Sequence, residues 1–169
     1  MLGPAPILDF DGTIAVLAVD WTELRRKLGV RSLDDLWGAD GADWDLVTRA
    51  EVGAAATAEP VAATIRSLDT VTAFAVLTNN SEFAVREFLR RFDGLASRLA
   101  GVVGRETLGG SKRNPERFRI GFERCVALTA AARAQGPVVY VGDARYELEL
   151  AADLGAGALD VGKIGVRVS

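Results

Sequence analysis

Near its N-terminus the chain reads Pro6-Ile7-Leu8-Asp9-Phe10-Asp11-Gly12-Thr13. A short apolar run, typical of a buried strand, is followed by two acids separated by one residue. Alternate residues of a strand share a face, so both carboxylates are expected to point toward the mouth of a sheet. Two carboxylates this close either raise one pKa or hold a divalent cation, and such oxygen ligands suit Mg²⁺ better than Zn²⁺. The stretch therefore predicts a metal-assisted enzyme.

Two other structures could account for the acidic pair. Asp and Gly both favour turns, so an acid-x-acid-Gly string can be an ordinary turn without chemistry. A calcium-binding loop is a more specific alternative. If Asp9, Asp11 and Gly12 filled its third, fifth and sixth positions, its first and last ligands would be apolar residues, namely Ile7 and Ala18. The calcium loop therefore fails at both ends.

Composition excludes several classes of protein. The 169 residues are 49% hydrophobic and carry a net charge of -3, which indicates one compact domain and argues against a general nucleic-acid binder. The chain has no histidine, so Ser-His-Asp triads, Cys-His pairs and histidine-dependent zinc sites are excluded. The single cysteine, Cys125, cannot form an internal disulfide and is expected to be buried. The chemistry must rest on carboxylates, lysine and hydroxyls.

The cellular setting is inferred from two absent patterns. The first residues show no secretory signal, and no apolar run approaches the length that spans a membrane. We therefore expect a cytoplasmic protein without a membrane partner, and a homodimer is left open.

Short β-rich runs alternate with helical stretches along most of the chain. We expect strands at 7–8, 73–77, 102–103, 138–141 and 158–161. We expect helices from Glu59-Pro60 to about 68, over about 81–92, from Asn114-Pro115 onward and over about 145–154. This alternation predicts an α/β fold with a Rossmann-like parallel sheet sandwiched by helices.

The stretch 16–58 breaks the alternation, because it offers helices without a strand. It also holds all three tryptophans, Trp21, Trp37 and Trp44. We expect it to form a small helical cap inserted after the first strand of a core that comprises 1–15 and 59–169. The tryptophans are most simply the hydrophobic core of this cap, and contact with a substrate is the functional alternative.

Polar residues follow several of the expected strands. Ligands of open α/β sheets bind beyond the carboxyl ends of the strands, so these positions form the candidate site. They are Asp9 with Asp11, Thr78 with Asn79, Lys112 in a Gly-rich loop, and Asp143 with Glu147 one helical turn later.

These four segments resemble, in order, the four short motifs of the haloacid dehalogenase-like (HAD) hydrolases. The matches are Asp9 to Thr13 with the Asp-x-Asp-Gly-Thr motif, Thr78-Asn79 with the hydroxyl motif, Lys112 and Asn114-Pro115 with the lysine motif, and Gly142-Asp143 and Glu147 with the acidic motif. Together they cover the whole Rossmann-like core. The resemblance implies the fold and chemistry of that family.

The resemblance implies a role for the residues that would contact the phosphoryl group. Asp9 would attack it and form an aspartyl-phosphate, while Asp11 would protonate the leaving oxygen and later activate water. The Thr78 hydroxyl, the Asn79 backbone N–H and the Lys112 ammonium would bind the phosphate oxygens.

Mg²⁺ is the cofactor that the resemblance implies. Asp9, the backbone carbonyl of Asp11 and Asp143 would bind the ion, and Glu147 would support its bound waters.

Three positions depart from the commoner residues of the family. Arg113, Ala144 and Glu147 stand where proline, serine and aspartate are frequent, and none of these changes removes a required charge. Without the resemblance, Lys112 and Glu147 would be interpreted as exposed surface residues and Asp11 as a turn-capping acid.

The leading hypothesis is a Mg²⁺-dependent phosphatase that hydrolyses a small phosphorylated metabolite. Dehalogenases of the family generally lack the second acid, so Asp11 favours a phosphatase or a phosphomutase. A phosphomutase that acts on a sugar phosphate is one alternative, although the short cap disfavours it. A module that accepts or binds a phosphoryl group without turnover is another.

Overall fold

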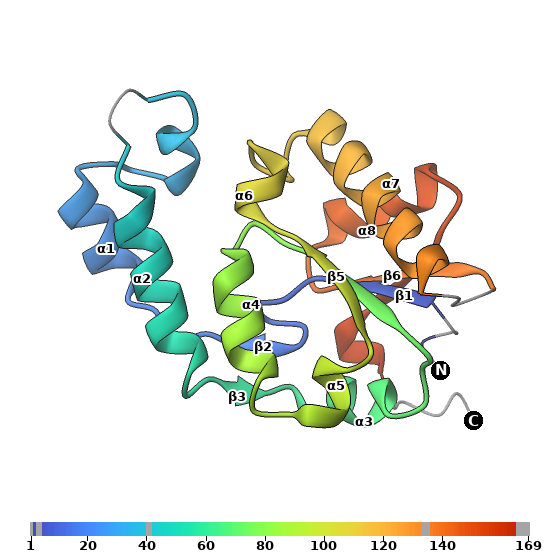
Figure 1. Ribbon diagram of the computed structural model, residues 1–169. Coiled ribbons are helices and arrows are strands. Elements are labelled where there is room, and N and C mark those ends of the chain that lie inside the picture. Colours follow the sequence, from blue (N-terminus) through green and yellow to red (C-terminus); the bar gives the residue numbers. More distant parts are fainter. Residues whose placement is uncertain (1, 3–4, 40–41, 133–135, 165–169) are drawn as a thin grey trace.

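A five-stranded parallel sheet lies at the centre of the molecule. The computed structural model describes residue 2 and residues 5–39, 42–132 and 136–164 (Figure 1). The sheet has the order β5-β4-β1-β6-β7, and every neighbouring pair of strands is parallel. Its strands are β1 (Ala5–Leu8), β4 (Phe74–Leu77), β5 (Leu99–Val103), β6 (Val138–Gly142) and β7 (Gly157–Asp160). The predicted α/β fold is thereby confirmed.

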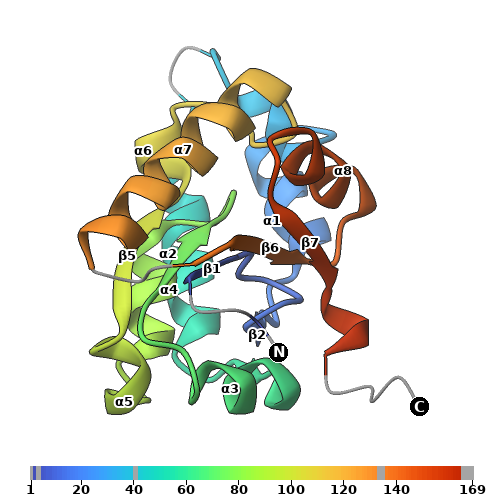
Figure 2. The ribbon, with the colours of Figure 1, turned by 90° about the vertical axis from the view of Figure 1, so that its right-hand side faces the viewer.

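Helices cover both faces of this sheet. Alternate strand residues point to opposite faces, so Leu8 packs in one hydrophobic cluster with Phe88, and Ile7 packs in the other with Phe118. The covering helices are α3 (Ala62–Leu68) and α4 (Glu82–Leu89) on the first face, and α7 (Pro115–Ala131) and α8 (Arg145–Asp153) on the second. Figure 2 shows α7 and α8 on the opposite side of the sheet from α3. Burial on both faces explains why the strands are continuous apolar runs.

Several helices begin where the sequence predicts. The Asn114 side chain accepts hydrogen bonds from the backbone N–H groups of Glu116 and Arg117, and Pro115 opens α7. The Ser81 hydroxyl caps the start of α4 in the same way. These caps satisfy backbone donors that have no partner within the helix.

One predicted helix start is wrong. Glu59 and Pro60 do not open a helix; they form the two-residue strand β3, and α3 begins at Ala62. β3 pairs antiparallel with β2 (Ala15–Val16), and the Val61 N–H donates to the Ile14 carbonyl at 2.9 Å. Pairing with a distant segment decides this conformation, which a proline signal alone does not detect.

The insert between β2 and β3 has a small core of its own. Its elements are α1 (Trp21–Leu28), η1 (Leu33–Leu36) and α2 (Trp44–Ala55). Leu24, Leu36 and Val47 are buried in it, and two of the tryptophans, Trp21 and Trp44, pack against them. Figure 1 shows α1 and α2 beside α4, and α2 packs directly on α4. A helical insert after β1 is confirmed, whereas the division into two domains at residues 16 and 58 stays a prediction.

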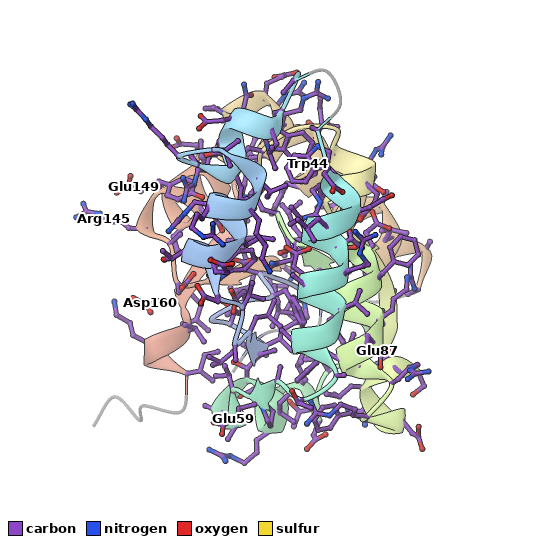
Figure 3. All side chains as sticks on the ribbon, turned by 90° about the vertical axis from the view of Figure 1, so that its left-hand side faces the viewer. Trp44, Glu59, Glu87, Arg145, Glu149 and Asp160 are labelled. Carbon is purple, nitrogen blue, oxygen red and sulfur yellow. The ribbon has the colours of Figure 1, made fainter. Side chains whose placement is uncertain are left out.

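Shorter elements complete the described chain. Three of them were not predicted: α5 (Asp93–Ala96), α6 (Arg105–Leu108) and η2 (Val161–Lys163). None of the helices in the described ranges is both long and apolar enough to cross a membrane. Charged side chains lie at the edges of the molecule in Figure 3, where Arg145 and Glu149 of α8 form an exposed ion pair at 2.8 Å.

Candidate active site

Three parallel strands carry the predicted residues to one edge of the sheet. Asp9 follows β1, and its N–H continues the strand ladder by donating to the Val141 carbonyl at 2.9 Å. Thr78 follows β4, with its N–H donating to the Val103 carbonyl at 3.0 Å. Asp143 follows β6. Because the strands are parallel, their carboxyl ends meet at the same edge.

A cavity of about 270 Å³ opens at this edge, and we call it the Asp9 cavity. Its lining residues are Asp9, Thr78, Asn79, Asn80, Lys112, Arg113, Asp143, Ala144, Tyr146 and Glu147. The structure therefore brings together all the predicted site residues except Asp11, which faces an adjoining cavity.

The centre of the Asp9 cavity is a buried lysine between two carboxylates. The Lys112 Nζ atom lies 2.7 Å from Asp9 Oδ1 and 2.8 Å from Glu147 Oε2. The Lys112 side chain is only 3% exposed. Burial by itself lowers the pKa of Lys112, but attraction to both carboxylates outweighs burial and raises the pKa above its ordinary value. The ammonium is thus held in its charged form, and the interpretation of Lys112 as a surface lysine is excluded.

Glu147 is also buried, and its oxygens are fully engaged. The Tyr140 hydroxyl donates to Oε2, the oxygen that also contacts Lys112, and the Tyr146 hydroxyl donates to Oε1 at 2.6 Å. The side chain therefore acts on Lys112, and its predicted support of metal-bound waters stays a prediction. The interpretation of Glu147 as an exposed residue is excluded, because it is 1% exposed.

Asp9 is incompletely compensated by its neighbours. Burial raises its pKa to about 6, although the Lys112 charge opposes that shift, and the nearby Glu147 carboxylate adds to it. Its Oδ1 atom also accepts the Phe10 N–H at 2.7 Å. The Asp9 carboxylate would therefore gain from a further positive charge placed beside it.

Asp11 and Asp143 lie close to the same loop. Burial raises the pKa of Asp11, an effect opposed by the Leu17 N–H that donates to Oδ1 at 2.9 Å and increased by the nearby Asp143 charge. Gly12 has a φ of +79°, and a Cβ added there would lie 2.7 Å from Asp143 Oδ2. Glycine thus permits both the left-handed backbone and the approach of the Asp143 carboxylate.

The donor atoms at this edge fit a hard divalent cation. The predicted set consists of the Asp9 and Asp143 carboxylates and the Asp11 backbone carbonyl, all oxygen donors of the kind that Mg²⁺ prefers. In the described ranges, no group of three or more Asp, Glu or Cys side chains is arranged to hold a metal. The predicted set needs only two such side chains, because its third ligand is a backbone carbonyl.

Thr78 is held by a hydrogen-bond relay. Its hydroxyl donates to Asn80 Oδ1 at 2.9 Å, and the Asn80 backbone N–H donates back to Thr78 Oγ1 at 3.1 Å. The Asn80 Nδ2 atom donates to Glu51 Oε1 at 2.9 Å, which fixes the side-chain amide with its oxygen toward Thr78. The Thr78 proton must therefore turn away from Asn80 before it can be donated to a ligand.

Glu51 connects the insert to this relay. It lies on α2, is 1% exposed, and accepts the Ser81 N–H at 3.0 Å. The Arg105 guanidinium donates to both of its oxygens, at 3.1 and 2.8 Å, and to the Thr48 hydroxyl at 2.8 Å. The same guanidinium lies over the Trp44 ring at 4.8 Å from its centroid. One face of α2 is thus fixed to the loop that follows β4.

The Lys112 backbone is fixed to that loop as well. Its N–H donates to Asn79 Oδ1 at 2.7 Å. The Asn79 backbone was predicted to bind phosphate, and this contact of its side chain was not predicted. Five residues that complete the site were not among the predicted site residues, namely Glu51, Asn80, Arg105, Tyr140 and Tyr146.

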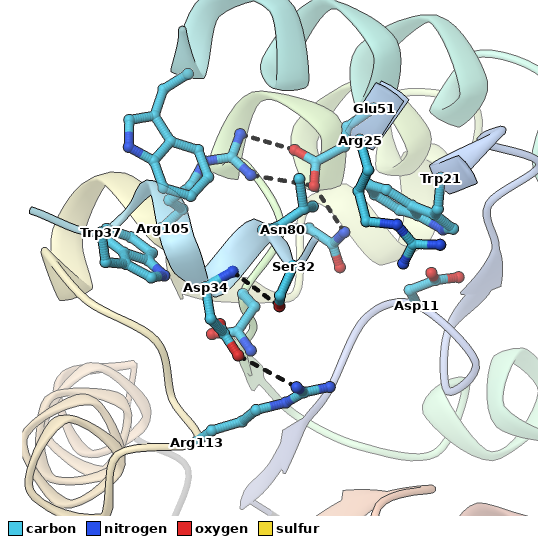
Figure 4. A pocket seen from close by; sticks show the side chains of 13 residues that line it. Asp11, Trp21, Arg25, Ser32, Asp34, Trp37, Glu51, Asn80, Arg105 and Arg113 are labelled. Atoms are coloured by element: carbon cyan, nitrogen blue, oxygen red, sulfur yellow. Dashed lines mark hydrogen bonds and ion pairs between the residues drawn. The ribbon is translucent and has the colours of Figure 1, made fainter. Parts of the chain in front are cut away.

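A second cavity, of about 290 Å³, lies between the insert and the core (Figure 4). We call it the tryptophan cavity, because Trp21, Trp37 and Trp44 line it. Asp11 lines this cavity and not the Asp9 cavity, whereas Asn79, Asn80 and Arg113 line both. The two cavities therefore adjoin, with Asp9 in one and Asp11 facing the other.

Comparison with known proteins bears on the fold. No protein-family model and no curated protein matches the chain. Among solved structures, a 2-haloacid dehalogenase from Pseudomonas syringae pv. Tomato DC3000 is 20% identical, with a TM-score of 0.52 over 94% of this chain and 85% of that chain. A HAD-superfamily hydrolase of subfamily IA, variant 1, from Geobacter sulfurreducens PCA is 20% identical, with a TM-score of 0.54 over 92% and 88%.

A third similar structure bears a different activity in its name. It is a HAD phosphatase from Thermococcus onnurineus, 22% identical, with a TM-score of 0.53 over 96% of this chain and 88% of that chain. The three names include both a dehalogenase and a phosphatase, so the likeness concerns the fold and leaves the reaction open. The chain has the fold of the HAD-superfamily hydrolases.

Proposed function

We propose that the protein is a Mg²⁺-dependent phosphatase that hydrolyses a small phosphorylated metabolite through an aspartyl-phosphate on Asp9. The observation that carries the proposal is that the two acids line two adjoining cavities. Asp9 and Lys112 line one cavity, and Asp11 faces the other. Cleavage of a phosphate ester needs a nucleophile on one side of phosphorus and an acid on the side of the leaving oxygen.

The reaction divides into two displacements. In the first, an Asp9 carboxylate oxygen attacks phosphorus, the bond to the leaving oxygen breaks, and Asp11 gives that oxygen a proton. In the second, Asp11 takes a proton from a water molecule whose oxygen attacks phosphorus. The bond between phosphorus and Asp9 then breaks, which releases phosphate and restores the Asp9 carboxylate.

Lys112 supplies fixed positive charge for both displacements. It contacts Asp9 at 2.7 Å, and Glu147 with its two tyrosines holds it in place. A preformed charge in a buried site stabilises the transferring phosphoryl group without reorganisation. The Thr78 hydroxyl and the Asn79 backbone N–H are the further donors in the proposal, and Thr78 becomes available when its proton leaves Asn80.

Mg²⁺ would be held by Asp9, Asp143 and the Asp11 carbonyl. When bound, the ion neutralises negative charge on the phosphoryl oxygens and on the nucleophile. The close approach of Asp143 to Gly12 supports this assignment, because it brings the Asp143 carboxylate to the loop that carries the other two ligands.

Dehalogenation is the competing reaction, since one similar structure is a 2-haloacid dehalogenase. A halide leaves as a stable anion and needs no proton, so an acid that faces the leaving group would have no task. The position of Asp11 in the tryptophan cavity therefore supports phosphate ester hydrolysis. The phosphomutase and the module without turnover remain hypotheses that product analysis separates from a phosphatase.

The test is hydrolysis of p-nitrophenyl phosphate with Mg²⁺ present or removed by chelation. We expect release of inorganic phosphate that requires Mg²⁺ and is abolished by Asp9→Asn. Asp153→Asn, which changes an exposed carboxylate on α8, serves as the matched control and should retain activity. Full activity of Asp9→Asn would refute the nucleophile. Halide release from 2-chloropropionate without phosphatase activity would favour a dehalogenase, and a stable phosphorylated protein would favour the module without turnover.

A further inference from the structure

The tryptophan cavity lies where the leaving group of a substrate would extend, an argument that rests on the proposed function. If Asp11 protonates the leaving oxygen, the rest of the leaving group has to occupy the cavity that Asp11 faces. Its volume of about 290 Å³ is near the lower end of the range of roughly 300–1,000 Å³ for ligand pockets. The cavity therefore suits a leaving group about the size of a single substituted ring.

The charges of this cavity are nearly all paired within the protein. Those that line it are three acids and three arginines: Asp11, Asp34 and Glu51, and Arg25, Arg105 and Arg113. Glu51 pairs with Arg105 at 2.8 Å, and Asp34 pairs with Arg113 at 3.2 Å. Only Asp11 and Arg25 remain, and the proposed reaction uses Asp11.

Arg25 is thus the cation of the cavity that is available to a ligand. Within the described parts of the chain, no carboxylate lies within ion-pair distance of its guanidinium, and its side chain contacts the Thr22 hydroxyl at 3.4 Å. Figure 4 shows the guanidinium pointing into the cavity on the side of Asp11. A second negative charge on the leaving group would find its partner there.

One aromatic ring of the cavity packs partly on the core of the insert but is covered by neither a second ring nor a cation from the described part of the chain. Trp44 is already covered, because Arg105 lies over its ring and the Trp37 ring packs 4.5 Å from it, measured between centroids. Among the described residues, the Trp21 ring has neither an aromatic partner nor a cation over it. Trp21 and Arg25 are four residues apart on α1 and therefore lie on the same face of that helix.

We propose that the substrate is a phosphate monoester whose leaving group combines a flat ring with a second anionic group. The ring packs on Trp21, and the anionic group pairs with the Arg25 guanidinium. The phosphoryl group lies in the Asp9 cavity, and the ester oxygen lies at Asp11, where the two cavities join. Helix α1 thus selects the substrate through two side chains of one face.

The test compares four phosphate esters that vary the ring and the second anion independently. They are 4-carboxyphenyl phosphate, phenyl phosphate, 3-phosphoglycerate and glycerol 3-phosphate. Each variant is compared with the unmodified protein on each substrate, so differences in intrinsic reactivity cancel. We expect Arg25→Met to lower kcat/KM for 4-carboxyphenyl phosphate at least about 10-fold more than for phenyl phosphate, as expected for the loss of a charged hydrogen bond.

Trp21→Leu tests the ring. It should lower kcat/KM for the two aryl phosphates about 3- to 10-fold more than for the two aliphatic phosphates, as expected for the loss of an aromatic contact. Arg26→Met is the matched control, because Arg26 is the next residue of α1, is 72% exposed and pairs with Glu23. It should change none of these ratios.

Binding of the products gives a readout that does not depend on turnover. Calorimetry should show that 4-hydroxybenzoate binds more tightly than phenol, and that Arg25→Met removes the difference. If the esters are hydrolysed but Arg25→Met lowers kcat/KM equally for all of them, the assignment of the cavity is overturned and the proposed function stands. If none of the four esters is hydrolysed with Mg²⁺, but 4-hydroxybenzoate still binds more tightly than phenol and Arg25→Met removes that difference, the proposed function fails. The assignment of the cavity to a flat ring with an anionic group then stands.

Discussion

The protein buries two charged clusters at the same sheet edge, and they differ in what remains unsatisfied. In the first, Lys112 lies between Asp9 and Glu147. The Asp9 carboxylate faces a cavity, and its pKa is raised to about 6. In the second, Arg105 holds both oxygens of Glu51. In the second cluster both carboxylate oxygens of Glu51 are paired with the guanidinium, as a structural connection requires. The first leaves an under-compensated carboxylate beside a cavity, as the proposed nucleophile requires.

Removal of the lysine should produce the largest effect. Lys112→Met leaves Asp9 and Glu147 facing each other without a cation, and it removes the charge that would neutralise the phosphoryl group. We expect kcat for p-nitrophenyl phosphate at saturating Mg²⁺ to fall by about 10²–10³-fold or more, the typical effect of losing one preorganised donor. A variant that kept a tenth of the activity would place the reactive centre elsewhere.

Glu51→Ala should chiefly affect stability. It leaves the buried Arg105 guanidinium without its carboxylate, and we expect the free energy of unfolding in urea to fall by about 3–5 kcal/mol. A double-mutant cycle with methionine tests the pair. The double variant Glu51→Met, Arg105→Met should lose less stability than Glu51→Met and Arg105→Met lose in total, because it buries no unpaired charge. Strict additivity would show that the two side chains act independently, contrary to the distances of 2.8 and 3.1 Å.

The exposed pair between Arg113 and Asp34 should have the smallest effect. Like the Arg105–Glu51 pair, it joins the core to the insert. Its N–O distance is 3.2 Å, and its side chains are 66% and 41% exposed. Solvent screens such pairs, so Arg113→Ala should lower the free energy of unfolding by less than about 1 kcal/mol. A loss as large as that of Glu51→Ala would mean that burial does not decide the difference between the two pairs.

Local signals in the sequence were sufficient for the sheet and for most of the candidate site. Strands buried on both faces are apolar runs, and the residues that directly follow them, such as Asp9 and Thr78, reach the same edge whatever the loops do. Glycine was informative for a similar reason, because Gly12 adopts a backbone that other residues avoid. Asp9, Thr78 and Asp143 directly follow their strands and line one cavity, whereas Asp11, two residues beyond Asp9, lines the adjoining cavity.

The second cluster was missed because its partners are distant in sequence. Glu51 and Arg105 are 54 residues apart, and each alone is an ordinary charged residue of a helix. A weak signal was present, since Trp44, Thr48 and Glu51 recur at the spacing of one helix face, but nothing indicated that this face would be buried. The error at Pro60 has the same origin, because the pairing of β3 with β2 depends on a segment some 45 residues away.

The attachment of α2 constrains how a substrate could enter and how a product could leave. Any movement of the insert as one rigid flap would have to separate Glu51 from Arg105, Asn80 and the Ser81 N–H, and would disturb the Thr78 relay at the same time. Opening and reactivity would then be in conflict. Helix α1 and η1 contact the core through the solvent-screened Arg113–Asp34 pair. Displacing these two elements would therefore let substrate enter and product leave at a lower cost in free energy than displacing α2.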